Sequence, residues 1–412
     1  MKEKIKTEIY LDNAATTKPD KEVVKLVCGA MEEFYGNPSG MYELGHKAKI
    51  ALDDAREKIA NIIGAKRPDE IIFTSGGTES DNIAVLGLAR AYKEKTSRSF
   101  GNKKHIITSK IEHHAVLHPC EKLEKEGFSV TYLDVDKYGM VNPQDVKNAL
   151  REDTILVSVM YANNEIGTIE PLSEISEIIK KFREQKKSPF PYFHTDACQA
   201  SGYLNLDVEK LGVDMMTLNS SKVYGPKGVG VLYLKFGIRV EPLVYGGGQE
   251  KNIRSGTENL PAILGFAKAL ELAEEKKEAE VKRLWKLNKK LTEGILNNIS
   301  KTFLNGHPKK RLPNNVNITI LDIEGEALIL HLDREGIYTS TGSACTSSSL
   351  DPSHVILATG LPYEAAHGSL RFTMGRETSE KDIDKVIEVL PKIVEKLRRI
   401  SPTKVDMSKL KI

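Results

Sequence analysis

The sequence predicts an α/β protein with a large domain, built on a mostly parallel central sheet, and a smaller α+β domain. Its 412 residues exceed one ordinary domain, and its 40% hydrophobic residues are enough for a large core. Short β-branched runs alternate with amphipathic helical stretches from about residue 20 to 265. From about residue 260 this pattern changes, which predicts a second unit.

Seven apolar runs are the predicted strands of the large domain. Helical patterns such as 46–63 and 172–185 separate them, as in a parallel sheet covered by helices. A strand buried on both faces is apolar nearly throughout, so residues 154–160 are predicted to lie centrally. The runs are EIIFT (70–74), HIIT (105–108), SVTYL (129–133), TILVSVM (154–160), YFHT (192–195), DMMTL (214–218) and GVLYL (230–234).

The second domain is predicted to begin with a long helix and to continue with strands and helices in turn. We expect the large domain to span 20–265 and the small one 266–412, with residues 1–19 packing near the small domain. The predicted elements are a helix at 260–298, a strand at 315–321, a helix through 325–332, a strand at 369–374 and a helix at 379–399.

Composition and charge exclude several classes of function. A net charge of +3 gives no electrostatic case for nucleic acid as the main partner, and the basic cluster PKKR (308–311) is interpreted as a solvated loop. There is no run of about 18 apolar residues and no secretory pattern at the start, so neither a membrane span nor export is expected.

The four cysteines lack CxxC or metal-ligand spacing. Reduced thiols in the cytoplasm, no bound metal, and packing roles for Cys28, Cys120 and Cys198 are therefore predicted.

Two reactive side chains, Lys222 and Cys345, carry the main functional hypothesis. Lys222 follows the apolar run 213–218, and an amine at such an edge loses its proton readily and can form a Schiff base with an aldehyde cofactor. Cys345 lies in the small-residue loop STGSACTSSS (340–349), which favours an exposed thiol. The pair suggests pyridoxal phosphate chemistry with a cysteine nucleophile. A solvated lysine and a buried structural cysteine are the alternatives.

Further candidates follow the predicted strands. SGGTES (75–80) opens a helix, where Gly77 and Thr78 suit a phosphate, although an ordinary capped loop is an alternative. Asp196 follows a strand and is suited to a protonated pyridine nitrogen, unless it only caps a helix; Gln199 is predicted to face the same pocket.

Histidine, amide and arginine side chains complete the candidate set. Of the adjacent His113 and His114, one is suited to stacking on a flat cofactor or moving a proton, although a lone histidine is more often structural. ANNEIG (162–167) offers amides after a strand but is also an ordinary turn. Arg371 is a candidate clamp for a carboxylate, and Arg376 is a second option.

Taken in order, these motifs resemble the NifS/IscS-type cysteine desulfurases, in the class V aminotransferase group of fold-type I pyridoxal phosphate enzymes. The resemblance covers about residues 8 to 400. It is carried by DNAATT (12–17), GNPSG (36–40), SGGTESDN (75–82), EHHAVL (112–117), NNEIGT (163–168), DACQ (196–199), SSKVYGPKGVG (220–230), GGGQE (246–250), RSGTEN (254–259), GSACTS (342–347) and RFTMGR (371–376).

The resemblance implies a role for each matching residue. Lys222 is the lysine that bonds pyridoxal 5′-phosphate, and Cys345 forms the persulfide. Thr257 reaches the phosphate in the neighbouring subunit, which implies a homodimer. The remaining roles are phosphate binding by Gly77 and Thr78, ring stacking and acid–base work by His113, pairing with the pyridine nitrogen by Asp196, hydrogen bonds near the ring hydroxyl from Asn164 and Gln199, and substrate carboxylate binding by Asn37 and Arg371.

One position departs from the family pattern. Relatives have Ser-x-His before the lysine, whereas this chain has Asn219, Ser220 and Ser221, so a serine replaces a histidine that helps to hold the phosphate. The Ser221 hydroxyl and the Asn219 amide can still donate hydrogen bonds. We expect the cofactor affinity to differ rather than the chemistry.

The implied reaction converts L-cysteine to L-alanine and keeps the sulfur on Cys345. An iron–sulfur scaffold protein or a sulfur carrier for tRNA thiolation is the expected acceptor, and Cys345 is also a candidate transient iron–sulfur ligand. The alternatives are a selenocysteine lyase, another class V enzyme such as an aminotransferase, or a non-catalytic scaffold. Cys345 argues against an aminotransferase, and Lys222 together with Cys345 argues against a scaffold. The long loop GSACTSSSLDPSHV resembles the group I enzymes.

Overall fold

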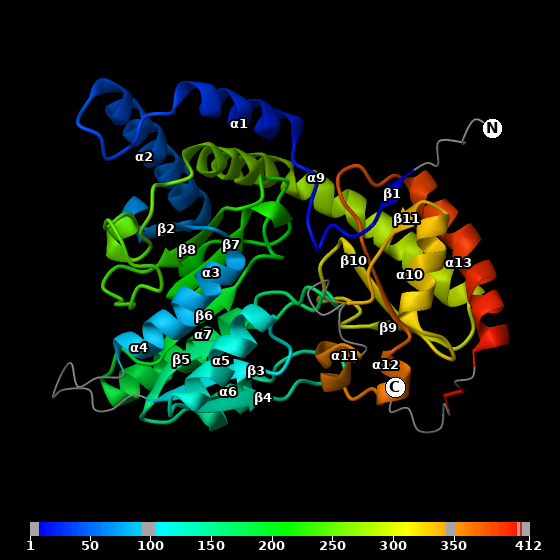
Figure 1. Cartoon of the computed structure of the whole chain (residues 1–412). Coiled ribbons are helices and arrows are strands. Elements are labelled where there is room, and N and C mark those ends of the chain that lie inside the picture. The colour runs from blue at the N-terminus through cyan, green and yellow to red at the C-terminus, as the bar shows by residue number, and fades with distance from the viewer. Residues whose placement is uncertain (1–7, 93–103, 343–350, 402–403, 406–412) are drawn as a thin grey trace.

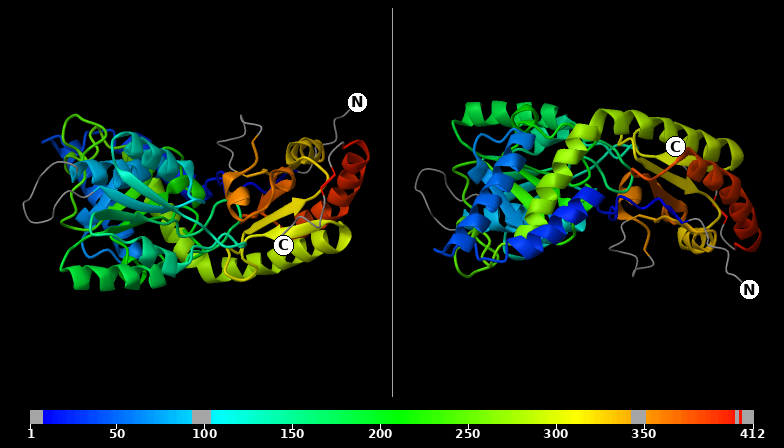
Figure 2. Two further views of the ribbon diagram at one scale, coloured as in Figure 1. Left: turned by 90° about the horizontal axis from the view of Figure 1, so that it is seen from below. Right: turned by 90° about the horizontal axis from the view of Figure 1, so that it is seen from above.

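The computed structural model describes residues 8–92, 104–342, 351–401 and 404–405, so Cys345 lies outside the described residues. Two lobes are joined by the long helix α9 (Leu260–Asn298), which runs along both (Figure 1). The views from below and above show the same division, with most of the blue-to-green ribbon in the larger lobe (Figure 2).

The large lobe is built on a seven-stranded sheet with the order β2-β8-β7-β6-β5-β3-β4. Strand β8 is antiparallel to both of its neighbours, and the remaining pairs are parallel, so the predicted mostly parallel sheet is confirmed. Each predicted strand overlaps an observed one. The strands are β2 (Ile71–Thr74), β3 (His105–Ser109), β4 (Ser129–Leu133), β5 (Thr154–Ser158), β6 (Tyr192–Asp196), β7 (Met215–Asn219) and β8 (Gly230–Leu234).

Helices cover both faces of this sheet because successive strand residues point to opposite sides. Phe73 packs with α2, α7 and the start of α9, whereas its neighbour Ile72 packs with η2, α4 and α5. The helical elements of this lobe are α1 (Lys21–Glu33), α2 (Glu43–Ile63), η1 (Pro68–Glu70), α3 (Gly77–Asn82), the π-helical turn η2 (Ile83–Gly87), α4 (Leu88–Ala91), α5 (His114–Lys125), α6 (Pro143–Ala149), α7 (Leu172–Lys186), α8 (Val208–Leu211), η3 (Ser220–Lys222) and η4 (Glu250–Asn252).

The small lobe has an antiparallel sheet with the order β12-β10-β9, packed against helices, as predicted for an α+β unit. Its N-terminal strand β1 pairs in parallel with β11. The elements are β1 (Ile9–Tyr10), β9 (Thr302–Asn305), β10 (Asn315–Ile320), α10 (Gly325–Arg334), β11 (Ile337–Tyr338), α11 (His354–Ala358), α12 (Tyr363–Ala366), β12 (Ser369–Thr373) and α13 (Glu380–Ile400).

Helix α9 belongs to both cores. Its residue Leu270 is buried in the large-lobe core, whereas Leu284 and Leu291 are buried in the small-lobe core. The domain boundary at 265/266 stays a prediction, and α9 crosses it without interruption.

The prediction that PKKR forms a solvated loop is wrong for its last residue. Arg311 is buried and donates to the carbonyl oxygens of Ile166 at 3.1 Å and Asn305 at 3.0 Å. These carbonyl groups accept the hydrogen bonds of a guanidinium that the sequence pattern predicts to be in solvent. Burial lowers the pKa of Arg311 to about 10. Within the described residues, no helix is both long and apolar enough to cross a membrane.

Candidate active site

A cavity of about 180 Å³ lies where β5, β6 and β7 end, beside the N-terminal segment and β12 of the small lobe. Ligands of open α/β sheets bind at this edge. Residues from both lobes line it: Ala14, Ala15, Gly77, Thr78, Asp81, His113, Met160, Ala162, Asn164, Asp196, Cys198, Gln199, Asn219, Lys222 and Arg371.

Lys222 reaches this cavity from the short turn η3, which directly follows β7. Its amine donates to the carbonyl oxygens of Ala14 at 2.9 Å and Ala15 at 2.5 Å. Gln199 donates its amide hydrogen to the same Ala14 oxygen at 3.0 Å. The N-terminal segment therefore fixes the direction of the amine.

Asp196 is the last residue of β6 rather than the first residue beyond it, and it is buried. Its carboxylate accepts a hydrogen bond from the backbone N–H of Cys198 at 2.9 Å, which orients the group at the cavity wall. This contact forms a turn and not the helix cap weighed as an alternative, because the next helix, α8, begins only at Val208. The carboxylate lines the cavity.

The SGGTES segment forms the start of α3, which continues through η2 and α4 as one helical path. Gly76 has a φ of 156°, and a Cβ on Gly77 would lie 2.8 Å from the Cys198 sulfur. Gly77 is thus needed sterically, because a side chain there would meet Cys198, whereas Gly76 is favoured by its positive φ and has open space around it. Gly77 and Thr78, in the first turn of this helix, line the cavity. Backbone N–H groups at a helix start are suited to binding an anion.

The two adjacent histidines face different surroundings. His113 is the N-cap of α5, and its Nδ1 accepts from the Ala115 N–H at 3.1 Å, so the neutral ring carries its proton on Nε2. His114 instead packs against the rings of His118 and His354, with centroids 4.8 and 4.7 Å away. Of the two, His113 lines the cavity.

Arg371 is buried in β12 with two of its donors already engaged. It donates to the Asn164 carbonyl oxygen at 2.9 Å and to the Asp12 carboxylate at 2.7 Å. Its Nε has no hydrogen-bond partner among the described residues and is suited to an incoming acceptor. The second option, Arg376, lies elsewhere, paired with Asp20 at 2.9 Å.

Three predicted residues do not line the cavity. Asn37 is exposed after α1, where its side chain accepts from the Ser39 N–H at 2.9 Å, and Thr257 is exposed in the loop before α9. The Ser221 hydroxyl donates to the Asn219 side chain at 3.3 Å, and of these two residues Asn219 lines the cavity. The roles of these residues stay predictions.

Sequence reasoning missed a buried acidic group beneath the cavity. Asp81 has a pKa well above its ordinary value because it is buried and because the Asp196 carboxylate is near. Burial also raises the pKa of Glu112 to about 8. Asp81 lies three residues after Thr78, one helical turn along α3, and this spacing was the available signal.

The remaining cysteines divide by exposure. Burial raises the pKa of the Cys198 and Cys120 thiols, in keeping with packing roles, but Cys28 is exposed on α1. The prediction of a packing role is therefore wrong for Cys28, because its position on the helix faces away from the core. Within the described residues, no group of three metal-binding side chains gathers.

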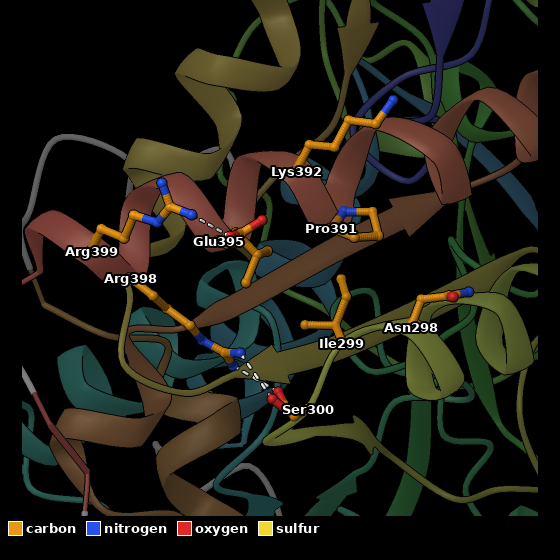
Figure 3. A pocket seen from close by; sticks show the side chains of 9 residues that line it. Asn298, Ile299, Ser300, Pro391, Lys392, Glu395, Arg398 and Arg399 are labelled. Atoms are coloured by element: carbon orange, nitrogen blue, oxygen red, sulfur yellow. Dashed lines mark hydrogen bonds and ion pairs between the residues drawn. The ribbon is translucent and has the colours of Figure 1, made fainter.

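A second hollow lies between the end of α9 and α13 (Figure 3). Arg398 donates there to the Ser300 carbonyl oxygen at 2.7 Å, and Arg399 pairs with Glu395. Lys392 contacts Glu388 at 3.0 Å. These cations already have partners, so the hollow offers less for chemistry than the cavity around Lys222.

Comparisons with known proteins show the family of the chain. The family model described as aminotransferase class-V matches residues 9–386. A cysteine desulfurase IscS from Methanosarcina thermophila is 53% identical over 403 residues, covering 97% of this chain and 96% of that protein. One from Dictyoglomus turgidum is 51% identical over 400 residues, covering 97% and 98%.

Solved structures show the same relationship. A NifS-like protein superposes with a TM-score of 0.86 at 36% identity, covering 95% of this chain and all 100% of that one. SspA in complex with cysteine has a TM-score of 0.76 at 34% identity, covering 89% and 99%. The chain therefore belongs to the class-V aminotransferase family.

Proposed function

We propose that this protein is a pyridoxal phosphate-dependent cysteine desulfurase that converts L-cysteine to L-alanine and holds the sulfur as a persulfide on Cys345. The observation that carries the proposal is that Lys222, Asp196 and Arg371 line one cavity. The relatives named cysteine desulfurase and the cysteine-bound SspA support the reaction and the substrate.

The residues of the cavity fit pyridoxal phosphate. The first turn of α3, which begins at Gly77 where a Cβ would meet Cys198, suits the phosphate, with Thr78 adding a hydroxyl. Asp196 suits the pyridine nitrogen, and the Lys222 amine suits the aldehyde. Asn164, Gln199 and His113 also line the cavity. The two amides are proposed to hydrogen-bond near the ring hydroxyl, and His113 is proposed to stack on the ring. When bound, the cofactor supplies an electron sink for the charge that develops on the substrate Cα.

Arg371 is the proposed holder of the substrate carboxylate. Its contacts with Asn164 and Asp12 fix the guanidinium before substrate arrives, which leaves Nε for the carboxylate. Such pre-organisation reduces the entropy lost on binding. Asn37 is proposed to contribute to the same site from outside the cavity lining.

Two groups are proposed to move protons. The Lys222 amine, once free, is proposed to move the proton on the substrate Cα, and its contacts with Ala14 and Ala15 hold it at the cavity edge. His113 presents Nε2, because Nδ1 is occupied by the Ala115 N–H. It is proposed to donate or accept a proton there.

The Cys345 thiolate is proposed to attack the substrate sulfur. An S–S bond forms, the substrate Cβ–S bond breaks, and the persulfide then passes to an iron–sulfur scaffold protein or another sulfur carrier. A homodimer is proposed, with Thr257 contributed to the neighbouring subunit. The thiols of Cys28, Cys120 and Cys198 are free, which favours the cytoplasm.

The test uses the purified holoenzyme with L-cysteine and a reductant. Alanine and sulfide should form in equal amounts, and Lys222→Ala should abolish both together with the visible absorbance of the bound cofactor. Cys345→Ser should abolish sulfide but keep the absorbance change on adding L-cysteine. A keto acid product would indicate an aminotransferase, and turnover of selenocysteine alone would indicate a selenocysteine lyase.

A further inference from the structure

We propose that Glu165 is a positioning residue that holds together the two ends of the segment between Gly342 and Ser353, the segment that carries Cys345. The proposal rests on the proposed function and adds to it the device that sets where sulfur transfer begins. Glu165 itself is not among the residues that line the cavity.

Glu165 is fixed by both lobes. It lies in the turn after β5, next to Asn164, and is buried. Its backbone N–H donates to the Asn163 side chain at 2.8 Å. Its carbonyl oxygen accepts from the side chains of Asn315 and Asn317 in β10, each at 3.0 Å. These contacts hold the Glu165 backbone from two sides.

The far end of the segment is attached to this carboxylate. The Ser353 hydroxyl donates to Glu165, while its oxygen caps α11 by accepting from the N–H groups of Val355 at 3.1 Å and Ile356 at 3.3 Å. The next residue, His354, donates from Nε2 to the Glu112 carbonyl oxygen at 2.9 Å. The end at Ser353 is therefore docked on the large lobe beside the active site.

The near end meets the same carboxylate. A Cβ on Gly342 would lie 2.8 Å from the Glu165 Oε2 atom and 3.6 Å from the Ser353 Cβ. Two residues earlier, the Ser340 carbonyl oxygen accepts from the Arg371 N–H at 2.6 Å. Both ends therefore lie at Glu165, the Ser353 end through a hydrogen bond and the Gly342 end through close approach. The Gly342 end is also tied, through Ser340, to the arginine proposed to hold the substrate.

This convergence limits where the thiol can act. Covalent geometry alone keeps a residue three positions beyond Gly342 within about 11 Å of it. Gly342 lies against Glu165, and Ser340 is hydrogen-bonded to Arg371. The point from which Cys345 can reach is therefore held beside the proposed substrate site. Removing the carboxylate releases the Ser353 end and lowers the fraction of time for which Cys345 is in attack geometry.

The predicted signature separates positioning from general damage. Cofactor loading and substrate binding are proposed to use Lys222, Asp196 and Arg371. The hydrogen-bond partners of Glu165 among the described residues are different ones, namely Asn163, Asn315, Asn317 and Ser353. Loss of Glu165 should therefore leave these steps unchanged and slow persulfide formation alone.

The experiment compares three variants of the holoenzyme with two controls. Glu165→Ala removes the carboxylate, Ser353→Ala removes its partner, and Gly342→Ala forces a Cβ against Glu165 while leaving that residue in place. Glu165→Gln retains an acceptor oxygen for Ser353. Ser379→Ala removes the N-cap of α13, whose hydroxyl accepts from the Asp382 N–H, and so matches the loss of a helix cap far from the site.

Each protein is mixed rapidly with L-cysteine. The absorbance change of the cofactor reports substrate binding, and mass spectrometry of quenched samples reports the persulfide. The three test variants should form persulfide roughly 10- to 100-fold more slowly with an unchanged absorbance phase. Glu165→Gln should retain most of the rate, and Ser379→Ala all of it.

Persulfide formation at the wild-type rate in Glu165→Ala and Ser353→Ala would overturn the inference, as would an equal slowing of both phases. If Glu165→Ala fails to fold, Gly342→Ala and Ser353→Ala decide. Absence of persulfide in the wild-type enzyme would instead refute the proposed function, so the two failures are distinguishable.

Discussion

The Lys222 amine nitrogen lies 2.9 Å from the carbonyl oxygen of Ala14, although 208 residues separate them in the chain. Two residues before Ala14, the Asp12 carboxylate pairs with Arg371 at 2.7 Å. One short N-terminal segment thus contacts both the proposed cofactor-binding lysine and the proposed substrate-binding arginine. It couples the two lobes at the cavity that these two residues line.

Gly77→Ala should weaken the cofactor site through a steric clash, since the added Cβ would lie 2.8 Å from the Cys198 sulfur. Overpacking of this kind costs about 1–3 kcal/mol. Denaturant unfolding and cofactor titration should both show the loss. The double variant Gly77→Ala/Cys198→Ala should recover part of it, and strict additivity of the two single changes would contradict the steric account.

Glu112 should make the folded protein less stable as the pH rises from about 5 to 8. Burial raises the pKa of its carboxyl from 4.5 to about 8, so in this window the folded state binds a proton that the unfolded state has lost. The free energy of unfolding then falls by at most about 1.4 kcal/mol per pH unit. The contribution of Glu112 to stability is thus fully present below the unfolded-state pKa and is lost as the pH rises through the folded-state pKa.

Glu112→Gln removes this titration and keeps an acceptor for the Ser109 hydroxyl and the Met160 N–H. Unfolding in denaturant at several pH values should show the variant gaining stability over the wild type as the pH rises. A constant difference between pH 5 and 8 would show that Glu112 keeps an ordinary pKa.

Arg371→Lys should raise KM for L-cysteine about tenfold or more, because a charge-assisted hydrogen bond contributes about 1.5–3 kcal/mol and lysine lacks the planar fork. Cysteamine, which has no carboxylate, is the matched substrate. Its slow turnover should change little in the variant. An equal loss for both compounds would mean that Arg371 acts on something other than the carboxylate.

Thr257 should act across the subunit interface, since it is exposed and outside the cavity lining of its own chain. In a mixed dimer, a Lys222→Ala subunit paired with a Thr257→Ala subunit should retain one intact site. A Lys222→Ala/Thr257→Ala subunit paired with wild type should bind cofactor about tenfold more weakly at the remaining site, as expected for one lost charge-assisted hydrogen bond. Equal affinities in the two hybrids would place Thr257 outside the site.

The strands could be predicted because hydrophobic periodicity is a local signal. Residues 154–160 are apolar nearly throughout, and β5 is buried on both faces of the sheet. The edges that carry Asp196 and Lys222 followed from where these runs end. The family resemblance then gave an ordered set of motifs over most of the chain.

Other features depend on contacts that no local pattern contains. Arg311 stands in a basic, proline-flanked cluster, yet it is buried because backbone carbonyl groups from distant segments surround it. The raised pKa of Glu112 and the role of the Ala14 carbonyl oxygen also arise from long-range packing. Glu165 was visible only as part of an amide-rich turn, because its partners are Gly342 and Ser353.

The most direct test follows the sulfur atom. The holoenzyme is exposed to L-cysteine without reductant, quenched and digested, and its peptides are examined by mass spectrometry. A single additional sulfur atom on the peptide that contains Cys345, absent in Cys345→Ser and in Lys222→Ala, is the predicted result. Alanine production with the added sulfur on Cys28, or with no sulfur on the protein, would contradict it.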